Sequence, residues 1–154
     1  MKKIFYVIVF AFTIGFNLNA QDFNTIPYNT QLKSFADGWY QLELEGVQLD
    51  VELRAGKYVK GNVTWPDGAS YSGGLSGAKL SGKGTYVWSN GHRYEGAFKN
   101  HQRHGIGSQI DADGMKWSGK WKGNQKNGKG KVFDPNGMVT QKGVWASDEL
   151  VARK

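Results

Sequence analysis

Two short stretches carry residue types that do chemistry in other proteins. Residues 77–85 read GAKLSGKGT, close to the glycine-lysine loop whose backbone N–H groups and lysine hold nucleotide phosphates. Residues 101–104 contain a His-x-x-His pair, a spacing that suits a metal ion. Both patterns are incomplete: Gly84 stands where the phosphate loop needs a hydroxyl, and the histidine pair lacks an evident third ligand.

A 23-residue repeat accounts for these glycines better than a phosphate loop does. Three units run over residues 71–93, 94–116 and 117–139, and their glycines fall in the same columns. Lys83 lies between two of these columns, and the second unit has isoleucine at that place. We therefore predict no nucleotide, cofactor or metal site. The glycines predicted to be structural are Gly73, Gly82, Gly84, Gly91, Gly96, Gly105, Gly107, Gly114, Gly119, Gly128, Gly130 and Gly137.

The spacing inside a unit is that of a β-strand. Tyr94, Gly96 and Phe98 alternate with Glu95 and Ala97, so the rings share one face of a sheet. Asp-Gly or Asn-Gly pairs between units are typical of tight turns. Each unit is predicted to be one hairpin. The predicted fold class is all-β, an elongated, single-sheet antiparallel meander of 23-residue β-hairpin repeats.

The repeated pattern Y-x-G-x-[FW]…G-x-G…[DN]-G resembles the membrane occupation and recognition nexus (MORN) repeat. YEGAFKNHQRHGIG at 94–107 and WSGKWKGNQKNGKG at 117–130 match it best, and the resemblance covers residues 48–146. It implies a twisted meander of hairpins and scaffolding between proteins, with attachment to membranes or anionic lipid in some members. We find no catalytic constellation and expect a non-enzymatic protein.

The first residues have the composition of a secretory signal. Lys2 and Lys3 precede the apolar run 4–16, and Ala20 precedes the predicted cleavage point. We expect export to a periplasmic or extracellular space, with an uncleaved N-terminal anchor as the alternative. The chain has no cysteine, so it is not expected to be a lipoprotein.

The expected organisation has four parts. A signal helix occupies residues 1–20, an irregular lead-in and the first strand or strands occupy 21–47, the repeat array occupies 48–146, and a tail follows at 147–154. A short helix is expected near residues 31–35, and the lead-in is expected to cover part of the aromatic face.

Positive charge is concentrated in the second half of the chain. Residues 21–70 hold four Lys/Arg against seven Asp/Glu, whereas residues 71–143 hold twelve against four. Strand alternation places most of these lysines away from the aromatic face, and Lys126 and Arg103 are expected to join them from hairpin loops. Such a face is either solvated surface or a contact for an anionic membrane or polymer; nucleic acid is not expected. The candidate contacts are Lys99, Lys120, Lys122, Lys126, Lys129 and Lys131.

The aromatic stripe also has two interpretations. Its rings either pack on one another as the core or leave a groove for an extended peptide or a sugar chain. The candidate groove residues are Trp88, Tyr94, Phe98, Trp117 and Trp121. The sequence thus predicts an exported binding or scaffold protein with a protein partner. The alternative is a peripheral binder of anionic membrane lipid or envelope polysaccharide, and the oligomeric state is left open.

Overall fold

The computed structural model describes residues 3–4, 23–24 and 26–153. The predicted signal helix at 1–20 lies outside these residues, apart from Lys3 and Ile4, which form a short strand. The described part of the chain holds no helix long and apolar enough to cross a membrane.

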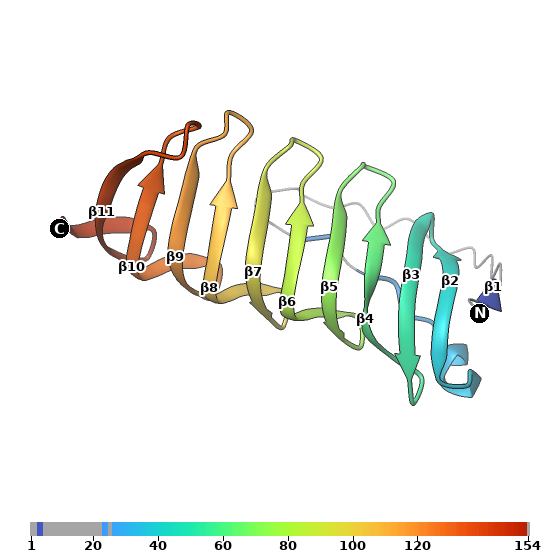
Figure 1. The fold of residues 1–154 in the computed structure, drawn as a ribbon. Helices are drawn as coiled ribbons and strands as arrows, with labels where there is room; N and C mark the ends of the chain where they lie inside the picture. Colours follow the sequence, from blue (N-terminus) through green and yellow to red (C-terminus); the bar gives the residue numbers. More distant parts are fainter. Residues whose placement is uncertain (1–2, 5–22, 25, 154) are drawn as a thin grey trace.

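One open sheet makes up the fold, with its strands side by side in sequence order (Figure 1). The two-residue strand β1 pairs in parallel with β2, and every later neighbour pair is antiparallel. The strands are β1 (Lys3–Ile4), β2 (Gly38–Leu44), β3 (Val47–Arg54), β4 (Lys57–Thr64), β5 (Ser70–Ser76), β6 (Lys79–Val87), β7 (Arg93–Lys99), β8 (Gln102–Ile110), β9 (Lys116–Lys122), β10 (Gln125–Phe133), β11 (Val139–Ala146) and β12 (Glu149–Arg153). The predicted all-β antiparallel meander is confirmed.

Turns of two kinds alternate along the array. Within units the turns have two central residues, and Asn100 and His101 both adopt positive φ, the conformation of the hairpin turn that matches strand twist. Between units, as at Pro66–Gly68, the glycine N–H donates to the carbonyl three residues earlier and the glycine is left-handed. This is the three-residue hairpin loop that ends in a glycine bulge.

Two predictions on the turns are wrong. The polar residues 99–105 end in glycine and so predict a hairpin loop, but only Asn100 and His101 lie outside the strands, because positive φ at both residues closes the hairpin at once. The sequence predicts a tail at residues 147–154. Instead, Ser147 and Asp148 form another two-residue turn, and β12 follows it and pairs with β11.

Eight glycines lie in register across the sheet, one on each strand from β4 to β11, and rings on a single face rest on them. Gly96 pairs with Gly107, and a Cβ on Gly107 would overlap the ring of Tyr94. Tyr71 lies in the same way over Gly84, and Trp117 over Gly130. The row is Gly61, Gly73, Gly84, Gly96, Gly107, Gly119, Gly130 and Gly143. The face that carries these rings is called the inner face below, and the opposite one the outer face.

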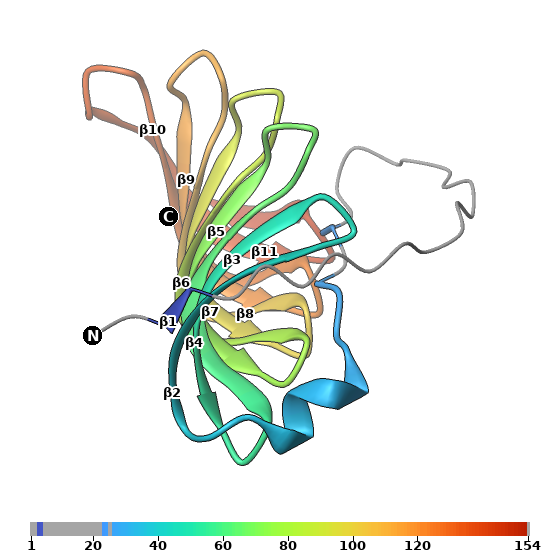
Figure 2. The ribbon, with the colours of Figure 1, turned by 90° about the vertical axis from the view of Figure 1, so that its right-hand side faces the viewer.

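The core lies on the inner face. A single sheet has no second layer to cover this face, so the rings pack on one another. Near-perpendicular ring contacts connect Tyr71, Phe98, Tyr94, Trp121, Trp117 and Trp145 in that order, with centroids 5.0–5.6 Å apart. The strands curve around this face, and the 3-10 helix η1 (Thr30–Ser34) lies on the inner side of the curve (Figure 2). Packing of rings on rings, and of rings on glycine, therefore holds the array together.

Candidate interaction surfaces

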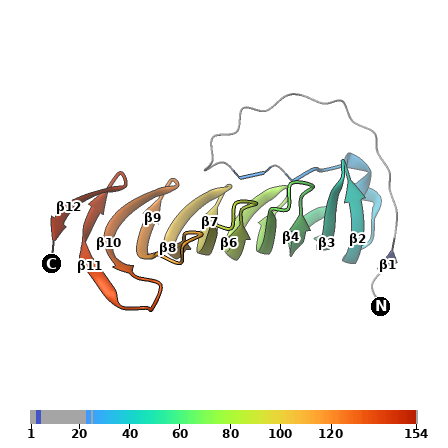
Figure 3. The ribbon, with the colours of Figure 1, turned by 90° about the horizontal axis from the view of Figure 1, so that it is seen from above.

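Part of the inner face is covered by the chain's own lead-in, residues 23–24 and 26–37. Phe23 contacts Tyr86, Trp88 and Phe98 with ring centroids 4.9–5.5 Å apart. Seen from above, the lead-in runs beside the strands from the middle of the array back towards β2 (Figure 3).

Buried side chains and hydrogen bonds hold the lead-in along this path. Ile26 and Leu32 are buried, and the hydroxyl of Tyr28 donates to the Gly56 carbonyl over 2.6 Å. The backbone N–H of Asn24 donates to the hydroxyl of Tyr86 over 3.2 Å. The expectation that the lead-in covers part of the aromatic face is confirmed for these residues.

The five candidate groove residues belong to the core. Tyr94, Phe98, Trp117 and Trp121 are at most 5% exposed, and Trp88 is half-buried against Phe23. Burial raises the pKa of the Tyr94 hydroxyl well above its ordinary value, as expected for a phenol held among other rings. The groove interpretation is therefore corrected: these rings fill the inner face rather than line an open channel.

Beyond β7 the inner face is covered by cations. The guanidinium of Arg103 lies 4.4 Å from the ring centroid of Trp121, and the ammonium of Lys126 lies 5.6 Å from that of Trp117. Arg103 is 3% exposed. The expectation that Arg103 and Lys126 join the lysine face from hairpin loops is wrong, because both lie within strands and register places them opposite Phe98 and Trp121 on the inner face.

A signal for this placement was present in the sequence. Arg103 and Lys126 follow Leu80 at intervals of 23 residues, and Leu80 is fully buried. Aligning that column would have assigned both cations to the inner face, where their charged groups lie over tryptophan rings.

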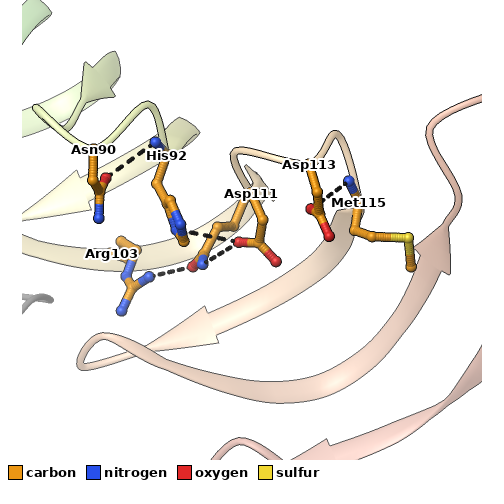
Figure 4. Close-up of polar contacts among 7 residues, drawn as sticks. Asn90, His92, Arg103, Asp111, Asp113 and Met115 are labelled. Atoms are coloured by element: carbon orange, nitrogen blue, oxygen red, sulfur yellow. Dashed lines mark hydrogen bonds and ion pairs between the residues drawn. The ribbon is translucent and has the colours of Figure 1, made fainter.

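A polar network holds Arg103 in place (Figure 4). Its guanidinium donates to the side-chain oxygen of Gln109 and to the backbone carbonyl of Asn124, and Gln109 in turn donates to Asp111. His92 lies 3.4 Å from the same carboxylate. Burial lowers the pKa of the Arg103 guanidinium, and the negative charge of Asp148 opposes that shift.

The remaining motifs have structural roles. The stretch 77–85 is a turn and most of strand β6, not a loop before a helix. One ring nitrogen of His101 lies 2.9 Å from the Ala78 carbonyl, whereas His104 stands on the outer face. Asp113 accepts a hydrogen bond from the Met115 N–H within its turn, as Asn90 does from His92 (Figure 4). No group of three metal-ligating side chains occurs in the described part of the chain.

The outer face of the second half carries the other predicted lysines. Lys99, Lys120, Lys122, Lys129 and Lys131 are all exposed. Strands β8 to β11 contain no aspartate or glutamate, and within the described residues none of these five lysines has a carboxylate within 4 Å. Their charges therefore remain available to a partner.

The fold and its two faces define a tandem β-hairpin repeat protein, in which one face is a core and the other is open. Residues 71–93, 94–116 and 117–139 each match the MORN repeat, so the chain is a MORN-repeat protein. MORN repeats are binding modules for proteins or membrane lipids. Comparison with curated proteins gives no match.

Proposed function

We propose that this chain is an exported, non-enzymatic MORN-repeat protein that acts as a scaffold for a protein partner. The observation that carries the proposal is the asymmetry of the sheet. The inner face is filled by its own rings, lead-in and cations, whereas the outer face of β6 to β11 is continuous and open. A partner would therefore bind the outer face.

Export is proposed from the sequence of residues 1–20. If the signal is cleaved after Ala20, Phe23 becomes the third residue of the mature chain, and its ring anchors the new N-terminus on β6 and β7. N-terminal sequencing of the protein recovered outside the cytoplasm tests this proposal, and recovery of the intact chain in the membrane fraction supports the anchor instead.

A second function is favoured by the exposed lysines. Each lysine near an anionic membrane contributes on the order of 1 kcal/mol, so the lysine-rich outer face would hold the protein on acidic lipid or on an anionic envelope polymer. Such binding weakens steeply with salt, because exposed charges are screened over about 10 Å at 0.1 M.

One pair of assays separates the two functions. In the first, the chain is floated on neutral and acidic vesicles at rising salt, with Lys129→Ser/Lys131→Ser as the test variant and Lys33→Ser/Lys57→Ser as the matched control. In the second, a partner captured from an envelope extract is identified and produced in pure form, and its affinity for this chain is measured. A salt-resistant complex with the pure partner supports the scaffold. Flotation only on acidic vesicles, lost only in the test variant, supports the lipid function and overturns the scaffold.

A further inference from the structure

A shallow groove crosses the outer face at β6 to β9. It has a volume of about 860 Å³, within the range of ligand sites, and glycines from the in-register row contribute to its floor. Thr85 pairs with Glu95, Glu95 with Ser108, and Ser108 with Ser118, so one row across the strands carries three hydroxyls and one carboxylate. The hydroxyls of Ser108 and Ser118 are 2.9 Å apart.

Longer side chains form the two walls. Lys83 and Ile106 stand on one side of this row, and Arg93, Ile110 and Lys116 stand on the other. The row continues onto Lys131 of β10, opposite Ser118. With neighbouring strands ~4.8 Å apart, the distance from Thr85 to Lys131 is roughly 20 Å, which is the length of about six extended residues.

The groove has an excess of positive charge. Three cations line it, and its one carboxylate, Glu95, is already bound by Arg93 over 2.6 Å. Lys83 is exposed, and Lys116 is half-buried with its ammonium 4.4 Å from the ring centroid of Phe133. A ligand that complements this groove must therefore carry negative charge.

The walls also offer apolar surface. Ile106 is 70% exposed although it lies in the middle of a strand, and Ile110 and Ala97 add aliphatic area to the groove. No aromatic ring lines it, so it lacks the flat surface on which a sugar ring would stack. Its floor lies between two walls of longer side chains. A flat bilayer would therefore meet the wall residues and leave the hydroxyls of the row uncovered.

We propose that this groove binds an acidic, extended polypeptide segment that also carries aliphatic side chains. Carboxylates of the segment contact Lys83 and Lys116, and an aliphatic side chain packs on Ile106. The inference rests on the proposed scaffold function and names the chemistry of the protein partner.

The test uses a fluorescein-labelled octapeptide of alternating glutamate and valine, with binding to the full chain followed by anisotropy at several salt concentrations. Two further probes replace every glutamate by glutamine or every valine by serine. There are three groove variants. One is the double variant Lys83→Ser/Lys116→Ser, and the other two, Lys83→Ser and Ile106→Ser, change a single exposed residue each. The matched control, Lys99→Ser/Lys122→Ser, removes the same charge from exposed outer-face positions at strand ends outside the groove.

The proposal expects the double groove variant to weaken binding of the Glu-Val probe by about tenfold and the control by no more than about twofold. Ile106→Ser should weaken the Glu-Val probe several-fold and leave the Glu-Ser probe unchanged. Equal weakening by the groove and control variants, or equal affinity for the glutamine probe, overturns it. Loss of vesicle flotation in the groove variants with no peptide binding also overturns it, in favour of lipid. A purified partner that still binds all three groove variants would leave the scaffold function standing and refute this site alone.

Discussion

The first half of the array closes its inner face with another part of the chain, and the second half closes it with its own cations. Phe23 packs on Tyr86, Trp88 and Phe98. One repeat further on, the matching positions hold Gln109, Asp111 and Trp121.

Two of the three rings are thus replaced by polar groups. These groups take part in the network that holds Arg103 over the remaining ring. The comparison shows that one backbone repeat accepts either an apolar or a charged cover, provided that the rings are shielded from water.

The largest effect on stability is expected at a feature that both halves share, a ring lying on a glycine. Gly84→Ala and Gly107→Ala each place a Cβ within the ring of Tyr71 or Tyr94. Overpacking against a ring wedged on the sheet should lower the free energy of unfolding by about 2–4 kcal/mol at both sites, as measured by urea denaturation. Ser72→Ala on the outer face is the control. A loss at only one of the two glycines would show that the halves differ in backbone as well as in cover.

Two substitutions at Arg103 separate the shielding of the Trp121 ring from the effect of the positive charge on stability. Arg103→Ala exposes Trp121 and leaves the Asn124 carbonyl without its donor, so we expect a loss of about 2–3 kcal/mol. Arg103→Leu restores the residue type of Leu80 in the same column and removes a buried charge, so stability should stay within about 1 kcal/mol of wild type or rise. Equal destabilisation by both variants would mean that the polar network, not shielding of the ring, stabilises this half.

Removing the ring of Phe23, which covers the inner face of the first half, should release the lead-in from the sheet. Phe23→Ala deletes three ring contacts, and because Phe23 is half-buried we expect a loss of about 2 kcal/mol. Limited proteolysis should then cut within residues 26–37 faster, whereas hydrogen exchange in β9 and β10 stays unchanged. Gln31→Ala, at an exposed position of η1, is the control. Unchanged cleavage would show that the lead-in is held by its other contacts.

The smallest effect concerns pH. Burial lowers the pKa of His101 below its ordinary value, so the native state favours the neutral imidazole. The unfolded chain then binds the proton more readily, and stability should fall as pH drops below about 6.5, the ordinary histidine pKa. Thermal melts of wild type and His101→Asn between pH 7.5 and 5 test this, because asparagine accepts the positive φ of this turn. An equally pH-dependent melt in the variant would assign the effect to another group.

Much of this protein follows from local sequence rules. The 23-residue period, the glycine columns and the alternation of rings with polar residues predict the hairpins, because left-handed turns and rings lying on the backbone both require glycine. The exposed position of Lys99, Lys120, Lys122, Lys129 and Lys131 follows from the same alternation.

Contacts between distant segments decided the rest. The side on which Arg103 and Lys126 lie depends on two-residue turns and on bulges at Gly105 and Gly128, which shift the register. The alternation within a strand does not show this shift, although the column of Leu80 does. The docking of Phe23 joins positions more than sixty residues apart, and the outer groove exists only where side chains from four strands meet in register. Periodicity fixes which residues face each way within a strand, but only packing decides what covers them.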